Sequence, residues 1–323
     1  MTISDFNKLV EEQKKYYSAL SNIISFDEFD KAIEKNKDLL DFLGDKASDS
    51  PIISIANGKT HLLSAEFLIS AEKTLQSISA CCRLGSFSDA NTLIRKYRDC
   101  LFLYLYIIEV LNNIGGLTET EYGEVIDGEI NEEKFLDIIK ILFYIYSSGI
   151  RKDEENKAVD GWFDNSAEDG SLFKFLDIKN YLYYLKKNKL VKDCIKKHNL
   201  EEKWEKLKRK QNNYVHNNSR CFITDNFISF DRYEKIISLL KNVRTDVTFI
   251  TSLFLTILIL IKPEYISSYD YIYYLEEEME PPNDSQYWIS PIVQTYLDEC
   301  LISIHLDLKE YLKANNPYNM AIK

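Results

Sequence analysis

The sequence predicts an all-α protein, a multi-helix bundle with at most one small β-hairpin near residues 221–230. The chain has 323 residues but only 10 glycines and 6 prolines. Both counts lie below average usage, roughly 7% and 5%, which favours long helices with few turns. Hydrophobic residues make up 45% and charged residues 28% of the chain, as in a folded globular protein. Apolar residues also recur at helical spacing through most of the sequence.

Polar connections that contain glycine or proline interrupt this periodicity and divide the chain into elements. Helices are expected over residues 4–21, 26–43, 61–83, 87–114, 131–146, 171–190, 201–213, 231–262 and 287–314. Connections are expected over residues 51–58, 115–130 and 149–170. The stretch CFITDNFISF at 221–230 is the one that could be extended, and it predicts the small hairpin.

Three of these helices have a predicted place in the bundle. Only a short break at Gly85 and Ser86 separates helix 61–83 from helix 87–114, so the two are expected to be antiparallel neighbours. Residues 247–261 are uncharged and lie between Asp246 and Lys262. They are fewer than the roughly 18–20 residues of a spanning helix, so we expect a buried central helix and no membrane segment.

A chain of this length can form one large helical domain, and we predict a single domain over residues 1–323. A subdivision remains open: an N-terminal helical hairpin (1–58), a central bundle (59–216) and C-terminal helices (217–323). The six cysteines form no CxxC pair, which indicates free thiols in a reducing compartment. The N-terminal segment is charged and amphipathic, so a soluble, cytoplasmic protein is expected.

The distribution of charge limits the partners that the protein can bind. The formal net charge of −11 disfavours unspecific binding of nucleic acid over the whole surface. Between Lys186 and Lys210, however, there are eleven basic and four acidic residues. This local surplus fits a phosphate-bearing ligand, although a solvated helix face is the alternative interpretation.

One segment within this basic region contains candidate catalytic residues. Arg209 and His216 are seven positions apart, which places them on one helix face two turns apart, with Asn212 between them and Asn213 beside it. An imidazole can transfer protons near neutral pH, and a guanidinium can hold a phosphate through paired hydrogen bonds. Together they are a minimal set for cleaving RNA without a metal or cofactor. The alternative is that His216 only ends the helix.

An arginine, four to six residues and a histidine at the end of a helix in an all-α protein resemble the signature of the HEPN superfamily. Arg209 to His216 fits with six intervening residues, and the phrases NNYVH (212–216) and SQYWISPIVQ (285–294) resemble helical bacterial proteins of defence loci. The resemblance implies a metal-independent endoribonuclease of a bacterial defence or toxin system that acts on RNA, often as a dimer. Lys210 stands where active members typically have a small polar residue, so an inactive relative is the alternative.

A second polar patch lies in the otherwise apolar segment 87–114. Arg95 and Asp99 are one turn apart, with Arg98 beside them. The functional hypothesis brings them to His216, where Asp99 orients the imidazole and Arg95 or Arg98 contacts a substrate phosphate. The alternative is a surface ion pair within one helix. His61, His198 and His305 have no metal-ligand spacing, so no metal site is expected.

Two other functions remain open at this stage. The chain could be a non-catalytic helical scaffold that binds a protein partner or a second copy of itself through a groove or dimer face. It could also be a sensor whose pocket for a small molecule or lipid is lined by residues 247–261.

Overall fold

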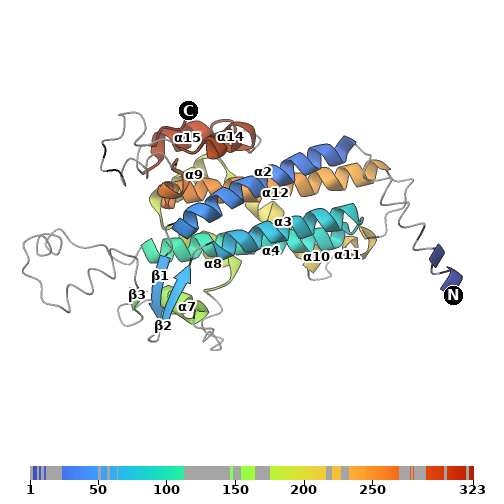
Figure 1. The fold of residues 1–323 in the computed structure, drawn as a ribbon, viewed down its shortest axis with the longest axis horizontal. Helices are drawn as coiled ribbons and strands as arrows, with labels where there is room; N and C mark the ends of the chain where they lie inside the picture. The colour runs from blue at the N-terminus through green and yellow to red at the C-terminus, as the bar shows by residue number, and fades with distance from the viewer. Residues whose placement is uncertain are drawn as a thin grey trace, which may run out of the picture.

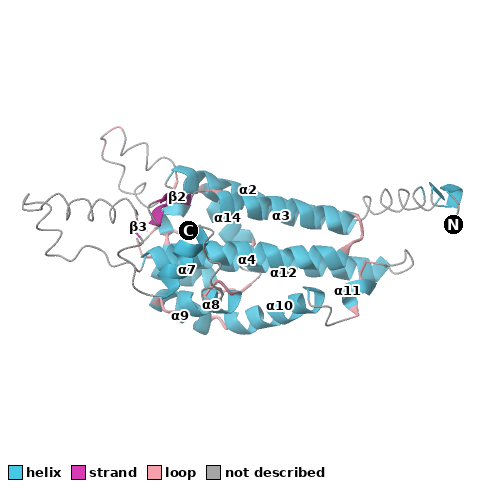
Figure 2. Cartoon of the chain, turned by 90° about the horizontal axis from the view of Figure 1, so that it is seen from below, coloured by secondary structure: helices cyan, strands magenta, loops and turns pink. Residues whose placement is uncertain are grey.

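The computed structural model is an elongated helical bundle, which confirms the predicted all-α, multi-helix fold (Figures 1 and 2). The structure describes residues 3–5, 7–8, 11, 24–49, 52–56, 59–63, 65–112, 146–147, 154–163, 175–215, 220–226, 233–268, 277, 279, 289–301, 304–317 and 320–323. The helices are α2 (Ile24–Asp49), α3 (Glu66–Arg83), α4 (Phe87–Asn112), α7 (Glu154–Phe163), α8 (Ile178–Leu185), α9 (Lys189–Lys197), α10 (Leu200–Val215), α11 (Cys221–Thr224), α12 (Tyr233–Ile261), the 3₁₀ turn η2 (Pro263–Ile266), α14 (Pro291–Glu299) and α15 (Leu308–Asn315).

Four long helices form the centre of the bundle. Helix α2 packs on α3 and α12, and α4 packs on the same two helices, so the four run side by side (Figure 1). Helices α8 and α10 cover the outer side of α4, while α14 packs on α2 and α15 packs on α12. Nearly all buried apolar side chains of the described residues form one cluster from Phe26 to Ile322; Ala65, Ala158 and Tyr214 lie outside it. The subdivision at residues 58 and 216 stays a prediction.

The link between α3 and α4 shows how the sequence builds this centre. Gly85 has a φ of 73°, the left-handed conformation that ends many helices. The Ser86 N–H donates to the carbonyl of Cys81 at 2.8 Å and the Gly85 N–H to that of Cys82 at 3.0 Å, so the last carbonyls of α3 are satisfied as the chain turns back. The prediction that the helices on either side of Gly85 and Ser86 are antiparallel neighbours is therefore confirmed.

Helix α12 contains the apolar segment 247–261. Every residue from Phe249 to Leu260 is buried. By length and composition α12 is long and apolar enough to cross a membrane, but 72% of its most apolar window is buried inside the protein. A core helix passes the same test, so the expectation of no membrane partner stays a prediction.

Three short strands form a small sheet that the sequence analysis did not predict. Strands β1 (Ile52–Ala56) and β2 (Lys59–Leu63) are antiparallel, and β3 (Tyr146–Ser147) pairs in parallel with β1. The helix predicted from residue 61 therefore begins at Glu66. The residues between β1 and β2 are Asn57 and Gly58, the pair most favoured in tight hairpins, so the signal was present in the sequence.

The hairpin predicted at residues 221–230 is wrong in its described part. Residues 221–224 form α11, where the Thr224 N–H donates to Arg220 O at 3.0 Å and the Asp225 N–H to Cys221 O at 3.1 Å. These local bonds satisfy backbone groups that an extended segment would have to pair with another strand. Residues 227–230 lie outside the described residues.

Several helix boundaries also differ from the predictions. The single C-terminal helix expected over 287–314 is two helices, α14 and α15. Between them, the carbonyl of Ile304 accepts a hydrogen bond from the Lys203 amine of α10 and not from a backbone N–H of a continuing helix. The helix expected over 171–190 ends at Leu185, and Asn188 caps α9 through its side chain. Helix α7 lies inside the expected connection 149–170. Of the helix expected over 131–146, only Tyr146 lies within the described residues.

Two glycines provide a matched test of this backbone. Gly44 is buried inside α2, where an added Cβ would meet the Cβ atoms of Ala65 and Leu68 at 3.9 Å, an ordinary contact. Gly44→Ala should therefore raise the free energy of unfolding by about 0.5–1 kcal/mol. Gly85→Ala should lower it by about 1–2 kcal/mol, because a side chain disfavours positive φ. Urea unfolding of both variants measures the difference, and a Gly85→Ala protein as stable as the wild type would contradict it.

Candidate functional site

Helix α10 has a buried face and an exposed face. Its buried residues lie on one face, toward α4; they are Leu200, Trp204, Leu207, Gln211 and Tyr214. Arg209 is two positions from both Leu207 and Gln211, which places it on the opposite side of the helix, where it is exposed. Asn213 is also exposed and Asn212 is half-buried.

Arg209 differs from the lysines around it. Its Nε donates to the carbonyl of Glu205 at 3.3 Å, and among the described residues no carboxylate pairs with it. Lys206 pairs with Glu202 at 2.6 Å, Lys208 pairs with Glu205 at 2.5 Å, and Lys210 pairs with Asp246 at 2.5 Å. Much of the basic run is thus neutralised locally, whereas the guanidinium of Arg209 has no such ion pair and contributes only a weak effect that helps to lower the pKa of Glu202.

His216 lies outside the described residues, so its distance from Arg209 stays a prediction from spacing. Two turns of a continuing helix would separate the two Cα atoms by about 10 Å along the axis. The side chain of Val215, the residue before it, is half-buried and lines a cavity of about 560 Å³ between α4 and α8.

Arg95 and Asp99 line the same cavity. The Arg95 Nε lies 3.6 Å from Asp99 Oδ2, so the ion pair expected as the alternative interpretation is present. Because Val215 borders this cavity, Arg95 and Asp99 lie near the end of α10 that leads into His216. Arg209 does not line the cavity and lies on the far side of the helix.

Arg98 is the buried member of this group. Its guanidinium is 1% exposed, donates to Asp99 Oδ1 at 2.8 and 2.6 Å, and also donates to the Gln211 side-chain oxygen of α10. The Trp204 ring lies 5.4 Å away from it. Burial lowers the pKa of Arg98 and the charge of Asp99 opposes this. The role of Arg98 is to join α4 to α10, which the sequence analysis missed because Gln211 is 113 positions away.

Two histidines that appeared isolated in the sequence meet in the structure. His198 Nδ1 lies 3.2 Å from His305 Nδ1, and the rings are edge to face at 4.6 Å. Burial, and then the charge of His305, lower the pKa of His198, so the neutral imidazole is favoured. Among the described residues no three His, Cys, Asp or Glu side chains are grouped to hold a metal ion.

Asp246 and Lys210 form a second polar link, between α12 and α10. The Asp246 side chain is 15% exposed; burial raises its pKa, and the Lys210 amine opposes that rise.

Comparisons of the chain with protein-family models, curated proteins and solved structures found no match.

The Arg98–Gln211 link can be tested by substitution. Gln211→Leu removes an acceptor from a buried guanidinium and should lower the free energy of unfolding by about 1–3 kcal/mol. Adding Arg98→Met should recover part of that loss, because both polar partners are then gone. Exposed Asn213→Ala serves as the control, with an effect below about 0.5 kcal/mol. Urea unfolding measures these differences in the free energy of unfolding. A Gln211→Leu protein as stable as the wild type would show that the bond adds no stability.

The Lys210–Asp246 pair should make stability depend on pH. Lys210→Ala leaves a buried carboxylate without its cation, so the pKa of Asp246 rises further above its unfolded value. The cost, about 1–2 kcal/mol at neutral pH, should shrink as pH falls toward about 4, because the folded protein then holds Asp246 protonated. Lys208→Ala removes a cation from a more exposed pair and is the control. Unfolding free energies measured from pH 4 to 7 check the slope, and a cost independent of pH would contradict it.

Proposed function

We propose that this chain is a HEPN-like, metal-independent endoribonuclease whose catalytic pair is Arg209 and His216. The observation that carries the proposal is the state of Arg209: an exposed guanidinium on the solvent side of α10, without a carboxylate partner among the described residues. A guanidinium in that state can bind a phosphodiester without first giving up an ion pair.

The chemistry follows from the two groups. Neutral His216 removes the proton from a ribose 2′-hydroxyl, and the 2′ oxygen attacks the adjacent phosphorus. The bond from phosphorus to the 5′ oxygen breaks, and the protonated His216 returns its proton to that oxygen. The products are a 2′,3′-cyclic phosphate and a 5′-hydroxyl. Arg209 neutralises the charge that grows on the phosphoryl oxygens.

The remaining predicted residues have supporting roles in this proposal. Asp99 would orient the imidazole, and Arg95 would contact the RNA away from the phosphate held by Arg209, because Arg95 and Asp99 line the cavity that Val215 borders and Arg209 lies on the far side of the helix. Asn212 and Asn213 flank Arg209 and would hold neighbouring phosphates. Catalysis in this form needs no metal and no cofactor.

The second candidate is a non-catalytic helical interaction protein, in which His216 only ends α10. The ion pairs of Lys206, Lys208 and Lys210 favour it, because neutralised lysines attract a phosphate backbone weakly. In that case the partner would be another protein or a second copy of the chain.

One RNA-cleavage assay distinguishes the two candidate functions. Labelled RNA is incubated with wild-type protein, His216→Ala and Arg209→Ala in the presence of a chelator. Loss of general acid–base catalysis should slow cleavage by about 100-fold or more in His216→Ala, with melting temperature unchanged. Lys313→Ala, an exposed lysine on α15, is the control for charge alone. If the wild type does not cleave RNA, or if both variants cleave it at the wild-type rate, the result favours the interaction protein.

A further inference from the structure

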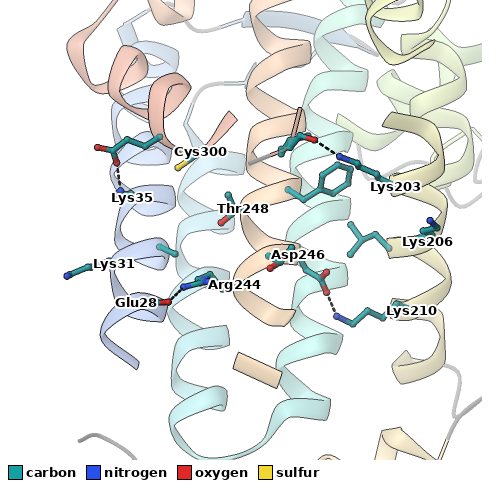
Figure 3. A pocket seen from close by; sticks show the side chains of 16 residues that line it. Glu28, Lys31, Lys35, Lys203, Lys206, Lys210, Arg244, Asp246, Thr248 and Cys300 are labelled. Carbon is teal, nitrogen blue, oxygen red and sulfur yellow. Dashed lines mark hydrogen bonds and ion pairs between the residues drawn. The ribbon is translucent and has the colours of Figure 1, made fainter. Parts of the chain in front are cut away.

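A cavity of about 740 Å³ opens between α2 and α10, with α12 between them (Figure 3). We call it the basic groove. Six basic side chains from these three helices line it: Lys31, Lys35, Lys203, Lys206, Lys210 and Arg244. They converge from segments more than 200 positions apart in a chain whose net charge is −11, so the groove is a local reversal of the charge of the protein.

The acids in the groove neutralise only half of these cations. Glu28 pairs with Arg244 at 2.5 Å, Asp246 with Lys210 at 2.5 Å, and Glu299 with Lys35. No other acidic side chain of the described part of the chain lines the groove.

The other three basic side chains of the lining are Lys31, Lys203 and Lys206. Lys203 donates to the carbonyl of Ile304, and Lys206 pairs with Glu202 outside the lining, in an exposed contact of little strength. Among the described residues, Lys31 has no carboxylate partner. Lys31 and Lys203 therefore give a surplus of about two positive charges, and Lys206 adds a third when a ligand displaces Glu202, so the groove complements a ligand with two to three negative charges.

The rest of the lining is suited to a ligand with an uncharged part. Leu207, Phe249 and Ile304 provide apolar surface, and Thr245 and Thr248 are polar residues beside it. The volume is within the range of roughly 300–1,000 Å³ typical of small-molecule sites. A free inorganic anion would leave the apolar part of the groove unused.

We propose that the basic groove binds a nucleoside di- or triphosphate, with the phosphates among Lys31, Lys203 and Lys206 and the nucleoside against Leu207 and Phe249. This site is separate from the proposed catalytic pair, since Arg209 does not line the groove. Lys206 and Lys210 lie on the same helix as Arg209, so the ligand would contact the helix that carries the catalytic pair.

The first experiment measures binding of a fluorescent trinitrophenyl-ATP to the full chain, with pyrophosphate, adenosine and a short oligoribonucleotide as competitors. Saturable binding that pyrophosphate displaces more strongly than adenosine is expected, because the amines hold the phosphates. Absence of saturable binding overturns the proposal. Displacement by the oligoribonucleotide at lower concentrations than by ATP also overturns it, since the groove would then belong to RNA.

Two variants test whether the probe binds in the basic groove. The double variant Lys31→Ala/Lys206→Ala should weaken probe binding by at least about tenfold, because two charge-assisted contacts are lost. Ala32→Phe, which keeps every cation but fills the wall of the groove, should weaken it to a similar degree.

The control is Lys192→Ala, an exposed lysine of α9 in a different basic hollow beside Lys189 and Lys196. It should bind the probe as the wild type does. If Lys192→Ala loses binding and the groove variants keep it, the assignment is wrong. Melting temperatures identify any variant that fails to fold, and either groove variant alone is then sufficient. RNA cleavage is not part of this readout, so the two proposals can fail independently.

Discussion

The bundle depends on one constraint: α12 carries an unbroken run from Phe249 to Leu260 that is buried on every side. A helix that is apolar all round must be covered all round. Helices α2 and α4 cover most of it, and η2, α9 and α15 close the rest. Each fully buried aliphatic or aromatic side chain contributes about 1.5–3 kcal/mol, so this segment is a large share of the driving force for folding.

The polar residues of that run are accommodated within the helix and by its neighbours. Thr251 donates to the carbonyl of Val247 at 3.0 Å and Thr256 to that of Ser252 at 2.7 Å. The Tyr97 hydroxyl of α4 lies 2.6 Å from the Thr251 hydroxyl. Because these groups are paired, the apolar helix can be buried without leaving them unsatisfied.

Helix α10 is attached to this centre by a few specific contacts, and these divide its surface. Arg98 holds the Gln211 face against α4, and Asp246 holds Lys210 against α12. The side of the helix that is left in solvent carries Arg209. The side that faces α2 and α12 carries Lys203, Lys206 and Lys210 of the basic groove. One helix thus provides both surfaces for which we propose functions.

The sequence by itself determined the helical class and most long elements, because the spacing of apolar residues is a local property. The hairpin at Gly85 and the burial of residues 247–261 follow from the same local signals. Only the tertiary structure decided which polar residues meet: Arg98 with Gln211, His198 with His305, and the six cations of the basic groove. It also decided where a predicted helix stops, as between α14 and α15, where the Ile304 carbonyl accepts from Lys203 of α10. These contacts join residues distant in the sequence, and no periodicity along a chain encodes the distance between two helices that fold onto each other.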